Sequence, residues 1–329
     1  MKALVTGGGG FLGKVIVSQL LDRGDSVRTF SRNTYPELAG GFVEQIAGDL
    51  CDADAVNKAA ADCDIVFHVG AKAGVWGAYK DYYRANVTGT LNIIDACKKN
   101  KINRLVYTSS PSVVFNGRDM NGVDESVPYA SHFDAPYPET KASAEKSVLE
   151  ANSPDLATVA LRPHLIFGPG DNHLIPRIVA KARKGRLRII GNGKNKVDVV
   201  YVDNAAKAHV LAADKLEPGS PVSGKAYFIS NGDPRPIKEL LNMFMELHNL
   251  PPVERHVPPG LAWFGGWLFE TTYNLLNIKQ EPLVTRFIAK ELSTSHWFDI
   301  SAARIDFGYI PEISIEEGIQ RIAKTNSQN

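Results

Sequence analysis

Cysteine, net charge and long apolar runs are all scarce in this sequence of 329 residues. Its three cysteines, Cys51, Cys63 and Cys97, form no CxxC pair, and the histidines lack the spacing of a metal site. This pattern excludes a disulfide scaffold, predicts no metal site and favours a reducing, cytoplasmic environment. With 37 basic and 36 acidic residues the formal charge is +1, so the sequence predicts no nucleic-acid partner.

Residues 261–278 are the most membrane-like stretch, because tryptophan and phenylalanine cluster there. Gly265, Gly266 and Glu270 interrupt the apolar run, which therefore falls short of the roughly 20 apolar residues that a membrane-spanning helix needs. We expect this segment to be a lid over an apolar substrate. Plain core packing and a peripheral contact with a membrane or a partner protein are the alternatives.

What the sequence does have is a regular alternation of short apolar runs and longer segments with helical spacing over residues 1–165. The apolar runs are continuous rather than alternating, which is typical of strands covered on both faces. The pattern therefore predicts an α/β fold with a Rossmann-type, doubly wound parallel sheet. Expected strands lie at 3–5, 27–30, 43–46, 65–67, 105–107 and 158–161, and expected helices at about 11–22, 53–60, 79–99 and 138–151.

The rhythm changes after Pro163, where the pattern becomes less regular. Strand-like segments nevertheless return at 197–202 and 226–229, with helices expected at 203–215, 236–247 and 314–323. We therefore expect a dinucleotide-binding domain at 1–165, with returning segments near 197–217 and 226–247. A smaller, interleaved substrate-binding region is expected at 166–196 and 248–329.

A glycine-rich loop, TGGGGFLG at residues 6–13, lies between the first expected strand and the first expected helix. In that position such a loop is typical of a dinucleotide phosphate site. The first glycine permits a tight turn, the second lets the backbone approach a pyrophosphate, and the third lets helix and strand pack closely. The expected phosphate-binding residues are Gly7, Gly10, Phe11, Leu12 and Gly13.

The end of the second strand indicates which coenzyme is used. An NAD site places an acidic residue there to hold the ribose, but this chain has Ser31 followed by Arg32. A guanidinium is suited to a 2'-phosphate, so the sequence favours NADP(H) and leaves NAD(H), with Arg32 simply solvated, as the alternative. After the third strand, Asp49 and its neighbour Leu50 are expected near the adenine.

A tyrosine and a lysine four residues apart form the candidate catalytic pair. In YPETK, Tyr137 and Lys141 share one face of a helix that starts near Pro138. The ammonium of Lys141 and a bound nicotinamide cation both favour the phenolate, as proton transfer to or from a substrate hydroxyl requires. Ser110 follows another strand at the same sheet edge and can hydrogen-bond the reacting oxygen.

These motifs make the chain resemble the extended short-chain dehydrogenase/reductase superfamily, and within it the 3β-hydroxysteroid dehydrogenase family. The resemblance rests on TGGGGFLG, on GDL at 48–50, YTSSPSVVF at 107–115, YPETK, LRPHLIFGPGD at 161–171 and VDVVYVDN at 197–204. It implies that Ser110, Tyr137 and Lys141 are catalytic. It also implies a cofactor site that includes Ala71, Lys72, Thr108, Tyr137, Lys141 and Pro163.

Within that family the blocks look closest to two activities, sterol-4-carboxylate 3-dehydrogenases and bacterial 2-alkyl-3-oxoalkanoate reductases. Both act on a carboxylate beta to an alcohol or ketone. The resemblance therefore implies interconversion of a β-keto acid and a β-hydroxy acid. The Ser31-Arg32 pair favours the NADPH-dependent reductase and leaves the sterol or 3β-hydroxysteroid dehydrogenase as the alternative. The expected partner is a small, lipid-like substrate, and a homodimer remains open.

Four further alternatives concern the function or the role of single residues. A nucleotide-sugar epimerase would share the fold, and the basic run at 177–188 would then bind a diphosphate, although such runs are more often solvated. A sensor that reads NADP(H) without turnover is disfavoured because Tyr137 and Lys141 are both present. His164 lies near the expected cleft, either against a substrate carboxylate or as a structural histidine. Asn86 either supports Lys141 through water or is an ordinary polar residue.

Overall fold

A seven-stranded parallel sheet is the centre of the molecule, which a computed structural model describes over residues 1–38 and 43–328. Its order is β12-β7-β5-β4-β1-β2-β3, so the chain reverses direction across the sheet beside β1. At such a point a doubly wound sheet opens a crevice at the carboxyl ends of its strands. The strands are β1 (Lys2–Thr6), β2 (Ser26–Ser31), β3 (Val43–Ala47), β4 (Ile65–His68), β5 (Arg104–Thr108), β7 (Ala157–Pro163) and β12 (Lys225–Ile229).

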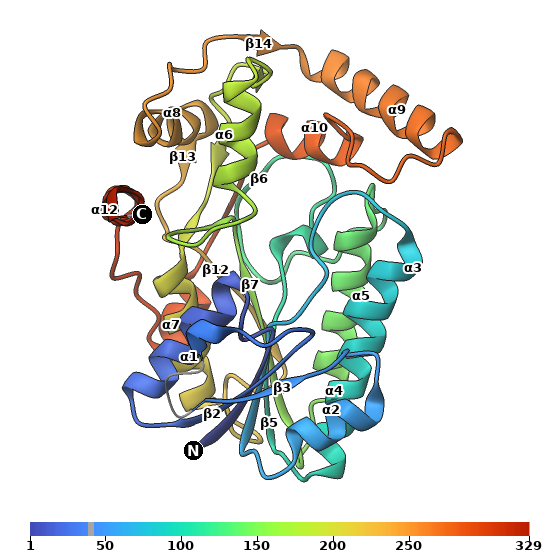
Figure 1. Ribbon diagram of the computed structural model, residues 1–329, viewed down its shortest axis with the longest axis vertical. Helices are drawn as coiled ribbons and strands as arrows, with labels where there is room; N and C mark the ends of the chain where they lie inside the picture. Colours follow the sequence, from blue (N-terminus) through green and yellow to red (C-terminus); the bar gives the residue numbers. More distant parts are fainter. Residues whose placement is uncertain (39–42, 329) are drawn as a thin grey trace.

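Helices cover both faces of this sheet, as the continuous apolar strands predict (Figure 1). On one face α1 (Phe11–Asp22) packs against α7 (Val202–Lys215), and on the other α4 (Gly89–Lys99) packs between α2 (Ala53–Ala60) and α5 (Pro136–Glu150). Every residue of β4 and β7 is buried. The fold is therefore the expected Rossmann-type α/β architecture.

Two expected elements differ in detail. The helix expected at 79–99 starts as α3 (Tyr79–Tyr82), continues as a π-helix (Tyr83–Thr88) and only then becomes α4. The segment expected as a strand at 197–202 is divided between two short strands, β10 (Lys196–Val197) and β11 (Val200–Tyr201). Neither joins the main sheet, because β10 pairs with β13 and β15 while β11 pairs with β8.

Of the segments expected to return to the first domain, some pack on the main sheet and one does not. Strand β12 extends the main sheet beside β7, and α7 covers the same face as α1. Helix α8 (Ile237–Leu247) instead packs against α6 (Ile175–Arg183) and α12 (Ile315–Gln328), away from the sheet. The remaining small strands are β6 (Met120–Val123), β8 (Ile166–Phe167), β9 (Ile189–Ile190), β13 (Arg235–Pro236), β14 (His256–Val257) and β15 (His296–Phe298).

The upper part of Figure 1 contains α9 (Pro259–Leu275) lying over α10 (Arg286–Ser293), and the short helix α11 (Ser301–Phe307) lies lower, beside β12. Helix α9 turns small residues toward α10: a Cβ on Gly266 would lie 2.7 Å from the backbone nitrogen of Arg286. Its other side is exposed, with Trp263 at 40%, Phe264 at 52% and Trp267 at 42%. Plain core packing is therefore wrong for this side of the helix.

None of the helices within residues 1–38 and 43–328 is long and apolar enough to cross a membrane. The same residues contain no cluster of histidine, cysteine, aspartate and glutamate suited to a metal ion.

Candidate active site

The glycine loop links β1 to α1 at the reversal point of the sheet. Gly7 has a φ of +66°, and a Cβ there would lie 2.8 Å from the Cα of Gly70. A Cβ on Gly13 would lie only 2.2 Å from the carbonyl oxygen of Gly7, so this position accepts no side chain without movement of the backbone. Gly10 is exposed, and its Cβ would meet only the carbonyl oxygen of Gly7, at 3.1 Å. The loop thus offers an open backbone surface at the N-terminus of α1, beside Phe11 and the buried Leu12.

The end of β2 lies against this loop, because the backbone N–H of Gly7 donates to the carbonyl of Phe30 at 2.9 Å. The next residue, Ser31, has a buried hydroxyl without a partner among the described residues. Arg32 follows it and is exposed. The sequence did not predict Tyr35, whose ring lies so close that a Cβ on Gly9 would be 2.0 Å from it.

Two neighbouring loops hold further residues of the expected cofactor site. Asp49 is exposed, and its carboxylate accepts the backbone N–H of Cys51 at 2.9 Å. Leu50 packs toward Gly70, where a Cβ would lie 3.2 Å from its side chain. Ala71 is exposed and Lys72 half-buried, in the loop that follows β4.

Asn86 ties this loop to the candidate catalytic helix. Its side-chain oxygen accepts the N–H of Lys72 at 2.7 Å, and its amide donates to the Lys72 carbonyl at 3.1 Å. The same amide lies 3.0 Å from the hydroxyl of Thr140, the residue before Lys141. Asn86 therefore acts on the surroundings of Lys141 through direct contacts, and it sits in the π-helix that the sequence pattern did not reveal.

Tyr137 and Ser110 come together at the carboxyl edge of the sheet. Tyr137 belongs to the first turn of α5, which begins with Pro136 and also contains Pro138. Desolvation by the surrounding protein raises the pKa of the Tyr137 phenol to about 12, and a hydrogen bond with Ser110 opposes that rise. The hydroxyl of Ser110 also lies 3.0 Å from that of Ser112, which donates to it. The phenol is therefore protonated at neutral pH and can donate a proton.

Lys141 is 2% exposed and lies one turn further along α5. Its ammonium donates to the carbonyl of Thr108 at 2.5 Å and lies 4.1 Å from the centre of the Tyr107 ring. Burial lowers the pKa of Lys141 to about 7, against the opposing charge of Glu145. Lys141 is thus held at the end of β5, the strand that leads to Ser110.

Pro163 is buried at the end of β7, and the chain then turns to His164. The Nε2 atom of His164 lies 2.7 Å from Nδ1 of His296, and both rings are buried. Burial lowers the pKa of both, so the two rings are neutral and share one hydrogen bond. His164 is therefore a structural histidine in this fold.

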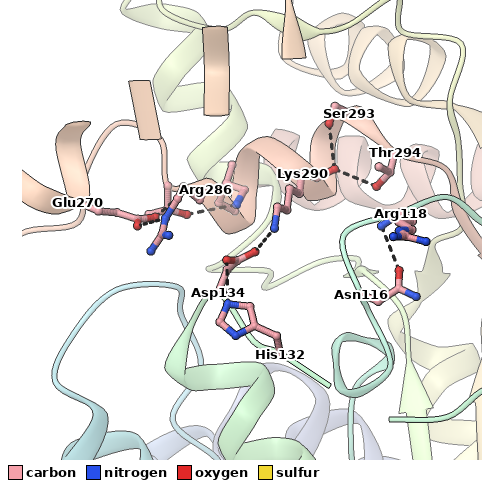
Figure 2. A network of polar contacts seen from close by, with 11 residues as sticks. Asn116, Arg118, His132, Asp134, Glu270, Arg286, Lys290, Ser293 and Thr294 are labelled. Carbon is pink, nitrogen blue, oxygen red and sulfur yellow. Dashed lines mark hydrogen bonds and ion pairs between the residues drawn. The ribbon is translucent and has the colours of Figure 1, made fainter. Parts of the chain in front are cut away.

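Helix α10 lies close to the start of α5. Figure 2 shows the Lys290 ammonium pointing at Asp134, which lies just before α5, and the ion pair measures 2.6 Å. On its other side α10 is joined to α9, because the Glu270 carboxylate accepts both the backbone N–H and the Nε–H of Arg286 at 2.6 Å. A small cavity beneath α10 is lined in part by Pro138 and Phe287.

Glu291 and Tyr82, which the sequence did not single out as site residues, act on the phenol of Tyr137. The charge of Glu291 on α10 and the phenol of Tyr82 both contribute to the raised pKa of Tyr137. Tyr82 is buried and donates to the carbonyl of Trp76 at 3.0 Å. The indole of Trp76 in turn donates to the carbonyl of Ile278, just beyond α9, at 3.2 Å. No local motif marks these residues, because they converge from distant segments.

Comparison with known proteins matches residues 4–257 to the 3-beta hydroxysteroid dehydrogenase/isomerase family. The chain belongs to this family. It is 51% identical to a 2-alkyl-3-oxoalkanoate reductase of Stenotrophomonas maltophilia, over 99% of this chain and 100% of the relative. It is 34% identical to the mouse (Mus musculus) sterol-4-alpha-carboxylate 3-dehydrogenase, decarboxylating, over 98% of this chain and 90% of the relative.

The fold is also that of a solved UDP-glucuronic acid 4-epimerase from Bacillus cereus in complex with NAD, with a TM-score of 0.77. The two chains are 22% identical, and the match covers 100% of this chain and 99% of the other. Family membership makes the protein an oxidoreductase of the dehydrogenase/reductase type, which acts on hydroxyl or keto groups with a nicotinamide coenzyme.

The residues present fit such a coenzyme. The glycine loop leaves its backbone open beside Gly10. The hydroxyl of Ser31, which has no partner within residues 1–38 and 43–328, lies next to the exposed Arg32. A buried polar atom without a partner carries a cost that a bound ligand group removes. The same edge of the sheet holds Tyr137 and Lys141, so coenzyme and proton-transfer groups would meet there.

Proposed function

We propose that this protein reduces a 2-alkyl-3-oxoalkanoate to the corresponding 3-hydroxy acid with NADPH. The observation that carries this proposal is the 51% identity, over the whole of both chains, to a protein named 2-alkyl-3-oxoalkanoate reductase. The preference for NADP(H) rests on Ser31 and Arg32, which provide a hydroxyl and a cation and no carboxylate at the end of β2.

The proposed chemistry assigns each group one task. The coenzyme, when bound, supplies the hydride that goes to carbon 3 of the substrate. Tyr137 donates its phenolic proton to the 3-oxo oxygen, and Ser110 hydrogen-bonds the same oxygen. Lys141 then favours the resulting phenolate through its positive charge until solvent returns the proton. The high pKa of the Tyr137 phenol suits this direction, because the group starts protonated.

We also propose that the sheet and its helices bind the coenzyme, while residues 166–196 and 248–329 form most of the substrate side. Helices α6, α9 and α10 from these ranges lie together above the carboxyl ends of the strands (Figure 1). The exposed tryptophans of α9, and the hydrogen bond from Trp76 to Ile278 just beyond the end of this helix, support a cover for a long alkyl chain.

Isotope transfer tests the proposed function directly. The enzyme is incubated with a 2-alkyl-3-oxo acid and NADPH that carries deuterium at the transferable position, and the product is analysed by mass spectrometry. We expect a 2-alkyl-3-hydroxy acid with one deuterium at carbon 3. If this product is absent and the enzyme instead turns over a 4-carboxysterol or a nucleotide sugar, the proposed substrate class is wrong.

A further inference from the structure

The small cavity beneath α10 is lined by parts of the two segments that carry Ser110 and Tyr137. Phe115, five residues after Ser110, lines it from one segment, and Pro138, the residue after Tyr137, lines it from the other. Its volume of about 60 Å³ is several times the roughly 10–15 Å³ that one water needs. The cavity therefore admits a carboxylate and the carbons attached to it, but not a whole long-chain substrate.

The lining of this cavity combines aromatic rings with an ion pair. The rings are those of Phe115, Phe133 and Phe287, and the first and last of these pack edge-on with centres 6.0 Å apart. The ion pair joins the ammonium of Lys290 to the carboxylate of Asp134 at 2.6 Å (Figure 2). Among the lining residues that the structure describes, Lys290 is the only permanent cation. The cavity thus places a positive charge beside apolar walls.

The neighbours of Lys290 keep its ammonium at this cavity. A Cβ on Gly117, where φ is +78°, would lie 2.9 Å from Cδ and 3.4 Å from Nζ of Lys290, so the lysine stem lies directly on this glycine. Helix α10 is itself fixed to α9 by the ion pair of Arg286 and Glu270 at 2.6 Å. The Lys290 side chain is 32% exposed and that of Asp134 is 12% exposed. The cation is therefore partly shielded from solvent but still accessible.

The ammonium of Lys290 has hydrogen-bond donors to spare. A lysine carries three N–H donors. Within residues 1–38 and 43–328, the Lys290 ammonium has one hydrogen-bond acceptor, Oδ2 of Asp134. The other carboxylate oxygen of Asp134 lies 3.6 Å from Nε2 of His132. Lys290 can therefore bind a second carboxylate without leaving Asp134.

The substrate of the proposed function carries its carboxylate and its alkyl branch on carbon 2, next to the carbon that is reduced. Groups on neighbouring carbons must enter neighbouring parts of one site. The carboxylate therefore has to lie close to the oxygen on which Tyr137 acts, in surroundings that supply a counter-charge. A hydrogen bond from an ammonium to a carboxylate is roughly twice as strong as a neutral one.

We propose that Lys290 binds the carboxylate of the substrate and so selects β-keto and β-hydroxy acids over uncharged ketones and alcohols. The proposal rests on the proposed function and names the residue that recognises the acid. Asp134 positions the ammonium in the free enzyme and shares it with the substrate in the complex. The phenylalanine rings of the cavity receive the carbons beside the carboxylate.

The test compares oxidation of a 2-alkyl-3-hydroxy acid and of its methyl ester with NADP⁺ at neutral pH. The ratio of kcat/KM for acid over ester cancels the contribution of Tyr137, which acts on both substrates. In Lys290→Met this ratio is expected to fall about 10- to 150-fold, the effect of losing one charge-assisted hydrogen bond. In Asp134→Asn it is expected to rise, by up to about fivefold, because the competing carboxylate is gone.

The opposite signs separate recognition from a structural role, since an ion pair that only holds α10 would change the ratio in the same direction, or not at all, in both variants. The matched controls are Lys225→Met and Asp306→Asn. They alter a similar pair, 2.8 Å long, at the start of β12 and thus at the other edge of the sheet. Both controls should keep the ratio of the unaltered enzyme.

An unchanged ratio in Lys290→Met overturns the role of Lys290, and so does a ratio in Asp134→Asn that falls or stays the same. If Lys290→Met does not fold, Asp134→Asn decides alone, because asparagine keeps the shape of the side chain. Failure of the unaltered enzyme to oxidise either the acid or the ester overturns the proposed function itself.

Discussion

Two glycines of the loop, Gly10 and Gly13, should respond differently to the addition of one methyl group. In Gly13→Ala the new Cβ would lie 2.2 Å from the carbonyl oxygen of Gly7 and 2.9 Å from the Cα of Gly8, both backbone atoms. We expect the free energy of unfolding to fall by about 1–3 kcal/mol, the range for an overpacked site. In Gly10→Ala the methyl meets only the oxygen of Gly7 at 3.1 Å, and the φ of −79° suits alanine. The free energy of unfolding should then fall by less than about 1 kcal/mol.

The affinity for NADPH should fall in Gly10→Ala even though this variant stays nearly as stable as the unaltered protein. Gly10→Ala places its methyl on the open side of the loop, where a pyrophosphate must approach the backbone. Loss of one charge-assisted hydrogen bond, worth about 1.5–3 kcal/mol, would weaken NADPH about 10- to 150-fold. Calorimetric titration with NADPH and thermal unfolding measure the two effects, with Gly265→Ala as control because nothing lies within 4 Å of its Cβ. Unchanged NADPH affinity in a folded Gly10→Ala variant would refute a phosphate site at this loop.

Three further substitutions test the remaining assignments. Tyr137→Phe should reduce turnover by ~10² to 10⁴ while NADPH still binds. The control is Tyr309→Phe, which removes a buried phenol that lies 2.9 Å from the carbonyl of the serine at position 230 and should leave turnover nearly intact. Near-normal turnover in Tyr137→Phe would contradict the proton-transfer role. Arg32→Ala should weaken NADPH and spare NADH in titrations, and equal losses would show that Arg32 does not bind the phosphate. Replacing Trp263 and Trp267 by alanine should raise KM for long-chain substrates more than for short ones, and an equal effect on both would argue against a lid.

The fold was predictable because the signals for it are local. Continuous apolar strands, helical spacing and the loop before Phe11 each occupy a few neighbouring residues. The π-helix was not predictable, since a single extra residue in one turn leaves the apolar spacing of the whole segment nearly unchanged. The strand expected at 197–202 failed for a tertiary reason: its two ends pair with different small sheets.

The candidate site divides in the same way. Tyr137, Ser110 and Lys141 follow strand ends or begin a helix, so their positions in the sequence indicate one sheet edge. Lys290 lies more than one hundred residues later and reaches the start of α5 only through the packing of α10. Tyr35 likewise covers the glycine loop from beyond the end of β2. Such residues carry no motif, because their role depends on contacts between distant segments.

Relative specificity across two substrates and two coenzymes tests the central claim most directly. The measurement is kcat/KM for oxidation of a 2-alkyl-3-hydroxy acid and of a 4-carboxysterol, each with NADP⁺ and with NAD⁺. A reductase of the proposed type should favour the alkyl acid over the sterol, and NADP⁺ over NAD⁺. A preference for the 4-carboxysterol with NAD⁺ would contradict both the proposed substrate and the role given to Ser31 and Arg32.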